Sequence, residues 1–140
     1  MSLEEEIRLQ RLYLDIEAVR FPERLLVDIS IPKSLNSCCV PALILQPVVE
    51  NAIKYGVSRV RRPVKVSIQA REENGKLIIT VNDDGDPLPA DAPHGTGVGL
   101  NNVYERLDAR YGEESNVSWG PRPEGGFGVT IEMPINRESC

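Results

Sequence analysis

Several features that mark particular protein classes are missing from this sequence. No apolar run comes near the ~20 residues that a membrane-spanning helix needs, and no signal peptide leads the chain. Basic residues form no long run, and the formal net charge of -5 argues against a nucleic-acid partner. These absences favour an ordinary globular domain that contacts neither nucleic acid nor membrane directly.

Cysteine and histidine are also sparse. The three cysteines, Cys38, Cys39 and Cys140, lack the C-x-x-C spacing of zinc sites, and we infer a reducing, cytosolic setting from them. The single histidine, His94, lies in a segment rich in proline and glycine. We interpret it as a surface loop residue and not as a catalytic one.

What is present suffices for one domain. The 140 residues are 41% hydrophobic and 26% charged, which is typical of globular proteins with one substantial core. Hairpin-linked strands alternate with helices, and this order predicts an α/β (α+β) two-layer sandwich. Residue periodicity predicts helices at 3–20, 43–56 and 100–111, and strands at 25–31, 64–70, 77–83, 117–120 and 127–135.

The first predicted helix has two apolar sides. Three acidic residues, Glu4, Glu5 and Glu6, occupy its first turn, where the helix dipole favours negative charge. A terminal helix of this kind lies in a deep groove or lacks a partner. One apolar stripe consists of Leu9, Leu12, Ile16 and Val19, and a roughly opposite one of Leu3, Ile7, Leu14 and Ala18.

The helix predicted at 43–56 carries polar residues in its middle. Asn51, Lys54 and Tyr55 share one face because residues three and four apart are neighbours on a helix. An amide, an ammonium and an aromatic ring could together serve a metal, a phosphate and a flat heterocycle, although a solvated outer face is the simpler interpretation. We expect a kink or late start at Pro47 and a C-terminal cap at Gly56.

A carboxylate ends the strand at 77–83. The preceding Asn74-Gly75 pair predicts a tight hairpin, and side chains alternate along a strand, so Asp83 shares the inward side of the apolar residues. An unpaired inward carboxylate is costly, but it could accept a hydrogen bond from an exocyclic amine such as that of adenine.

A long loop, 84–96, follows and ends in the sequence GTGVG at residues 95–99, with a helix expected directly from Gly99. Backbone N–H groups at a helix N-terminus bind anions, and glycines let phosphate oxygens approach. A Walker P-loop is excluded because no Gly-Lys-Ser/Thr follows. A dinucleotide-binding fingerprint is not favoured either, because no strand runs directly into the glycines and the expected downstream acidic residue is missing.

These motifs, in this order, resemble the ATP-binding domain of the GHKL superfamily, and specifically LytS-type sensor histidine kinases. The sequence QPVVENAIKYG at residues 46–56 resembles the N box of that subgroup. The sequence DDG at 83–85 resembles its first glycine box, and GTGVGLNNV at 95–103 its second. The Gly-Gly pair at 125–126 resembles the last box, and residues 1–21 resemble the linker helix before a catalytic domain at 22–140.

The resemblance implies a Bergerat-type ATP-binding fold with about five mostly antiparallel strands and helices on one face. It implies that Asn51 ligates Mg²⁺, that Lys54 contacts phosphate and that Asp83 accepts a hydrogen bond from the adenine amine. Glu50 is a further catalytic candidate beside Asn51 and Lys54. The remaining nucleotide contacts implied are Tyr55, Gly85, Gly95, Thr96, Gly97, Val98, Gly99 and Leu100.

The sequence departs from the family at Pro87, where a second glycine is usual, and at Asp84, where asparagine is common. It also lacks the phosphoacceptor histidine, so a catalytic fragment is expected. The resemblance implies a bacterial, membrane-anchored homodimer with this domain in the cytoplasm, an acceptor helix elsewhere, and a response regulator. The alternatives are a GHKL-type ATPase and a nucleotide-sensing module without phosphotransfer.

Overall fold

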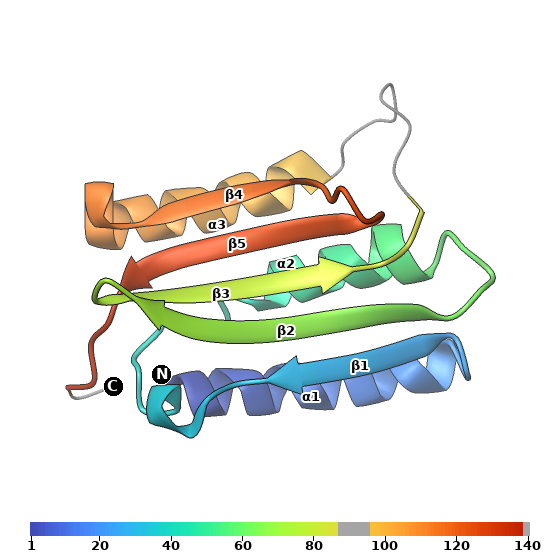
Figure 1. The fold of residues 1–140 in the computed structure, drawn as a ribbon, viewed down its shortest axis with the longest axis horizontal. Coiled ribbons are helices and arrows are strands. Elements are labelled where there is room, and N and C mark those ends of the chain that lie inside the picture. Colours follow the sequence, from blue (N-terminus) through green and yellow to red (C-terminus); the bar gives the residue numbers. More distant parts are fainter. Residues whose placement is uncertain (87–95, 139–140) are drawn as a thin grey trace.

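Five strands form one mixed sheet in the computed structural model, which describes residues 1–86 and 96–138 (Figure 1). They lie in the order β1-β2-β3-β5-β4, and only β1 and β2 are parallel. The predicted, mostly antiparallel sheet is therefore confirmed. The strands are β1 (Leu25–Ser30), β2 (Val64–Glu73), β3 (Lys76–Asp83), β4 (Asn116–Pro121) and β5 (Phe127–Pro134).

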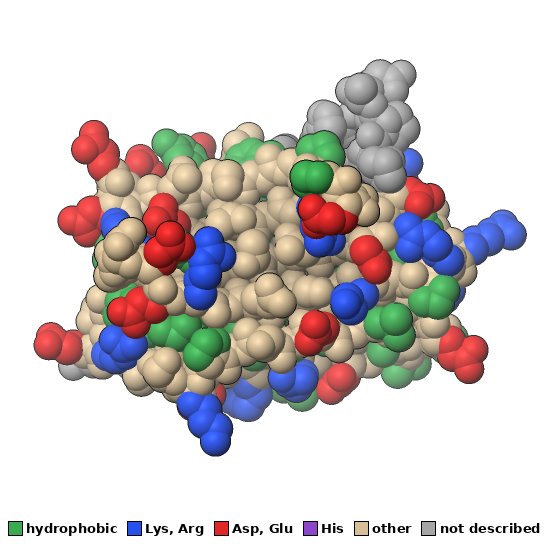
Figure 2. All heavy atoms as spheres, viewed as in Figure 1, with side chains coloured by type: hydrophobic (Ala, Val, Ile, Leu, Met, Phe, Trp, Pro, Cys, Tyr) green, Lys and Arg blue, Asp and Glu red, His purple; other side chains and the backbone are tan. Residues whose placement is uncertain are grey.

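The long helices cover one face of this sheet, as the two-layer prediction requires (Figure 1). The core lies between the layers, and the opposite face of the sheet presents mostly polar side chains and backbone at its centre (Figure 2). The helical segments are α1 (Leu3–Arg20), η1 (Lys33–Leu35), α2 (Gln46–Asn51), η2 (Ala52–Val57), α3 (Thr96–Tyr111) and η3 (Gly112–Glu114).

The β2–β3 hairpin sets the register that turns Asp83 inward. Asn74 and Gly75 both have positive φ, 55° and 77°, as a type I′ turn requires. Counting back from this turn pairs Asp83 with Val66, whose side chain is fully buried on the helix side of the sheet. The predicted inward orientation of Asp83 is therefore confirmed.

The helix predicted at 43–56 differs from the observed one. Its late start is confirmed, because α2 begins at Gln46 with Pro47 in the first turn. Regular α-helix ends at Asn51, and the chain continues as a π-helical segment in which the Ser58 N–H donates to the Ile53 carbonyl at 2.9 Å. The prediction of Gly56 as a C-terminal cap is wrong, since Gly56 lies within this π-helical segment.

The last helix also begins earlier than expected. We predicted a start at Gly99, but α3 begins at Thr96. A glycine inside a helix costs only about 1 kcal/mol relative to alanine, and no proline blocks this turn, so the glycine-rich sequence is compatible with helix.

The two stripes of α1 meet different surroundings. The stripe that contains Leu3, Ile7 and Leu14 is buried in the core, whereas Ile16 and Val19 of the other stripe are 69% and 81% exposed. One side of α1 thus belongs to the fold, and the other is an uncovered apolar stripe.

No helix in residues 1–86 and 96–138 is long and apolar enough to cross a membrane.

Candidate functional site

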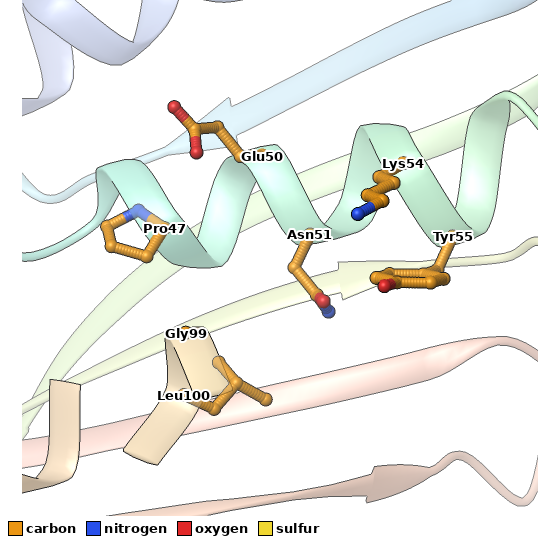
Figure 3. A pocket seen from close by; sticks show the side chains of 7 residues that line it. All are labelled: Pro47, Glu50, Asn51, Lys54, Tyr55, Gly99 and Leu100. Carbon is orange, nitrogen blue, oxygen red and sulfur yellow. The ribbon is translucent and has the colours of Figure 1, made fainter. Parts of the chain in front are cut away.

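A cleft lies between the α2–η2 segment and the start of α3 (Figure 3). The apolar side of α2–η2, which includes Val49, Ala52 and Ile53, is buried against the sheet, so its polar side is left to face outward. The start of α3 approaches this side closely, because a Cβ atom built on Gly99 would lie 3.9 Å from the Cβ atom of Pro47. The lining residues are Pro47, Glu50, Asn51, Lys54, Tyr55, Gly99 and Leu100.

The predicted amide, ammonium and ring do lie together in this cleft. Asn51 and Tyr55 point toward α3 in Figure 3, and the Lys54 ammonium lies 5.3 Å from the centre of the Tyr55 ring. At that distance the cation is attracted by the ring face. One wall of the cleft therefore combines an oxygen donor, a positive charge and a flat apolar surface.

Glu50 borders the same cleft but is oriented differently. Its carboxylate points away from Asn51 (Figure 3) and accepts a hydrogen bond from the Gln46 side chain at 2.9 Å. Since these residues are four apart on α2, the contact is local to that helix. Glu50 thus lies at the rim, on the side opposite to Asn51 and Tyr55.

Asp83 lies next to the cleft, against the backbone of Gly56, which follows Tyr55 in the sequence. Its side chain is 4% exposed, and a Cβ atom built on Gly56 would come within 2.7 Å of the Asp83 Cγ atom. Only glycine therefore permits this approach. On the other side the Gly85 N–H donates to Asp83 Oδ1 at 2.9 Å. The backbone at two glycines, Gly56 and Gly85, thus encloses the carboxylate.

Sequence reasoning missed why Gly56 is a glycine. A single glycine at the end of a predicted helix has the same pattern whether it caps the helix or permits a close contact. The inward Asp83 was the available signal, since a buried carboxylate beside a helix needs a neighbour without a side chain.

Burial dominates the electrostatics of Asp83. The pKa of this carboxyl is raised from its ordinary value of 3.8 to about 6: burial raises it most, the hydrogen bond from the Gly85 N–H lowers it, the charge of Asp84 raises it and that of Arg122 lowers it. Arg122 also donates to the Asp83 carbonyl at 3.0 Å. A buried carboxyl of this kind can accept a hydrogen bond from an uncharged amine without requiring a full counter-charge.

The neighbouring Asp84 is directed elsewhere. Its carboxylate accepts a hydrogen bond from the Lys65 N–H at 2.7 Å, and Arg62 donates to its carbonyl at 2.9 Å. The Asp84 side chain is therefore tied to the start of β2. This contact holds the carboxylate that stands where the family commonly has an asparagine.

One predicted site residue, Gly95, lies outside the described part of the chain, as do Pro87, where the sequence departs from the family, and His94. For Thr96, Gly97 and Val98 only the backbone in α3 is described. Among residues 1–86 and 96–138, no group of three or more His, Cys, Asp or Glu side chains could hold a metal ion.

Residues 41–137 match the family model described as "Histidine kinase-, DNA gyrase B-, and HSP90-like ATPase". This range contains every residue that lines the cleft, as well as Asp83 and its two glycine neighbours. The resemblance inferred from the glycine-rich motifs is thereby confirmed.

Curated relatives are sensor histidine kinases. The chain is 36% identical over 139 residues to the sensor histidine kinase BtsS of Escherichia coli K12, covering 99% of this chain and 25% of that protein. It is 33% identical over 141 residues to the sensor histidine kinase YesM of Bacillus subtilis, covering 99% of this chain and 24% of that protein. The chain thus spans about a quarter of the length of these relatives.

Solved structures share the fold. The catalytic domain of the histidine kinase ThkA superimposes with a TM-score of 0.74 at 18% identity, covering 99% of this chain and 95% of that one. The Acinetobacter baumannii histidine kinase AdeS gives 0.67 at 14% identity, covering 97% and 66%. The five-strand sheet with helices on one face is therefore the fold of histidine kinase catalytic domains.

The raised pKa of Asp83 predicts a specific dependence of stability on pH. The folded carboxyl, with a pKa of about 6, binds its proton more tightly than the unfolded one at 3.8. The resulting stabilisation is complete below pH 4 and is lost as pH rises through 6; it amounts to at most roughly 3 kcal/mol. Urea unfolding from pH 4 to 8 should show a steeper loss of stability in the wild type than in Asp83→Asn. Equal slopes would contradict the assignment.

Proposed function

Because this chain belongs to the histidine kinase-, DNA gyrase B-, and HSP90-like ATPase family, we propose that it is the ATP-binding catalytic domain of a LytS-type sensor histidine kinase. It binds Mg²⁺-ATP and donates the γ-phosphate to a histidine on a segment outside this chain. One observation carries the proposal. A buried carboxylate, Asp83, lies directly beside a cleft that offers an amide, an ammonium and an aromatic ring.

The adenine end of the site is formed by Asp83, Gly56 and Tyr55. The Asp83 carboxylate accepts a hydrogen bond from the exocyclic amine, and the Tyr55 ring forms a wall against the flat base. The glycines at 56 and 85 let the backbone pass close to the carboxylate because neither carries a side chain over it. Adenine recognition thus depends on one buried acceptor.

The phosphate end is formed by Lys54, Asn51 and the first turn of α3. Mg²⁺ prefers oxygen ligands and usually keeps several waters, so a single amide oxygen from Asn51, with phosphate oxygens, fits its needs. Lys54 supplies positive charge, and the first turn of α3, from Thr96 to Gly99, supplies backbone N–H groups that phosphate oxygens can accept from. The metal neutralises phosphate charge when it is bound.

Catalysis is chiefly positioning and charge neutralisation, as is general for phosphoryl transfer. The acceptor comes from another segment or protomer, because His94 is the single histidine of this chain. Glu50 is the remaining catalytic candidate: its carboxylate lies at the rim of the cleft, where an incoming histidine could be polarised.

The chain spans about a quarter of its relatives' length. The properties of a full-length protein are therefore also proposals. We propose a homodimeric, membrane-anchored kinase with this domain in the cytoplasm and a response regulator as its partner. Residues 1–21 act as the linker to the phosphoacceptor region, and residues 22–140 as the catalytic domain. The exposed apolar stripe of α1, which includes Ile16 and Val19, supports a partner surface there.

Replacement of Asp83 tests the adenine contact. Asp83→Asn converts one acceptor oxygen into an amide donor, so ATP affinity should fall at least about tenfold because a site built for this hydrogen bond is left mismatched. Inosine triphosphate carries a carbonyl oxygen in place of the exocyclic amine and serves as the matched ligand; because the new amide can donate to that oxygen, its affinity should not fall in the variant. Calorimetry measures both. Equal loss for the two nucleotides, or unchanged ATP affinity, would refute the contact.

Replacement of Asn51 tests the metal contact. Asn51→Ala should remove most of the dependence of ATP affinity on Mg²⁺, because the protein's oxygen ligand is gone. Titration of ATP with and without Mg²⁺ measures this dependence, and Gln46→Ala on the same helix is the control. If the variant keeps the metal dependence of the wild type, Asn51 is not the ligand.

Phosphotransfer is tested with γ-labelled ATP. The chain alone should not label itself, whereas a separately supplied histidine-helix segment of a LytS-type kinase should gain acid-labile label. Binding of ATP without any transfer would favour the nucleotide-sensing alternative, and free phosphate release without an acceptor would favour the ATPase. Stable label on His94 would contradict the assignment of the acceptor to another segment.

A further inference from the structure

A buried carboxylate on α1 has no part in the cleft. Glu6 is 0% exposed, whereas its neighbours Glu4 and Glu5 in the same helical turn are exposed. The first-turn acids that we expected to serve the helix dipole therefore do not act as one group. Burying a carboxylate is costly unless it is hydrogen-bonded, so the contacts of Glu6 indicate what it does.

Glu6 reaches from α1 to the turn that precedes α2. One oxygen accepts from the Ile44 N–H at 3.1 Å, and the other from the Gln10 side chain at 3.2 Å. The Leu43 N–H and the charge of Arg106 on α3 also stabilise the ionised carboxyl and so lower its pKa, although burial outweighs them and raises it overall. The groups that face this carboxylate thus come from α1, the 41–44 turn and α3.

The turn that Glu6 contacts is strained. Leu43 has a φ of 59°, in the left-handed region that non-glycine residues rarely adopt. Its side chain is 46% exposed, so packing of that side chain does not account for the conformation. From the other side, Arg106 donates to the Ala42 carbonyl at 2.7 Å. Two helices therefore hold a backbone conformation that the local sequence disfavours.

This turn determines where α2 begins. The Gln46 N–H donates to the Leu43 carbonyl, and the Val49 N–H donates to the Leu45 carbonyl at 2.9 Å, which starts the helix. The N-cap residue of α2, Leu45, makes no side-chain capping bond. Glu6 instead accepts the Ile44 N–H one residue before this N-cap, and the same N–H also donates to the Pro41 carbonyl at 3.2 Å, so the turn that leads into α2 is held by a residue of α1.

We propose that Glu6 is a positioning residue that couples α1 to the nucleotide cleft. By holding the Leu43 turn it fixes the start of α2, and α2 carries Asn51 into the cleft. A displacement of α1 that withdraws Glu6 releases this turn and weakens nucleotide binding. The coupling to ATP rests on the proposed function, whereas the control of α2 by Glu6 does not.

The nucleotide-free chain tests the control of α2. Glu6→Leu removes the acceptor at similar size and should speed hydrogen exchange of the backbone amides at 48–58 at least about tenfold. Glu6→Gln keeps an acceptor and can donate to the buried Gln10 Oε1, which has no hydrogen-bond partner among residues 1–86 and 96–138, so it should retain wild-type exchange. Glu4→Leu is the matched exposed control. Wild-type exchange in a folded Glu6→Leu chain would overturn the proposal.

Relief of the strained turn separates positioning from general stability. Glycine adopts the conformation of Leu43 freely, so Leu43→Gly in the Glu6→Leu background should restore slow exchange at 48–58. ATP affinity, lowered at least about fivefold in Glu6→Leu, should return to within twofold of the wild type. Failure of Leu43→Gly to restore either quantity would overturn the positioning role.

Two outcomes keep the inference separate from the proposed function. If the wild type binds no ATP, the proposed function fails, while the nucleotide-free exchange still decides the role of Glu6. If Glu6→Leu does not fold, the coupling is tested in the wild type. Because coupling between two sites is reciprocal, saturating ATP should slow hydrogen exchange of the Ile44 amide at least about threefold. An exchange rate of that amide that is the same with and without ATP would overturn the coupling.

Discussion

The contact between the Asp83 carboxylate and the bare backbone of Gly56 constrains the rest of the site. It requires a strand that turns Asp83 inward, which the Asn74-Gly75 hairpin provides by fixing the register. It also requires a helical segment that passes over the carboxylate without a side chain. The π-helical segment at 52–57 places Gly56 there while Asn51 and Tyr55 stay in the cleft. π-helical turns of this kind often occur at functional sites.

Alternation along β3 and helical spacing along α2 were sufficient to predict part of this arrangement. Asp83 had to share a side with Ile79 and Val81, and a two-residue turn left only one register. Asn51, Lys54 and Tyr55 had to be neighbours if residues 43–56 were helical. These inferences succeed because each depends on short-range geometry that tertiary contacts do not alter.

Other features could not be predicted because they depend on contacts between distant segments. One π-helical segment of six residues is too short to change an apolar pattern detectably, so Gly56 was assigned a capping role. Glu6 was indistinguishable from Glu4 and Glu5, since only the approach of the 41–44 turn buries it. Similarly, the sequence alone does not show that Leu43 is strained or that its turn lies between two helices.

The carboxylate of Asp83 provides the most direct measurement. Its pKa, followed by carbon NMR of the side-chain carboxyl, should be about 6 in the free chain. Saturating Mg²⁺-ATP should lower it, because a hydrogen bond from the adenine amine favours the charged form, and burial can increase little in a group that is already 4% exposed. An unchanged or raised pKa in the complex would contradict adenine recognition by Asp83.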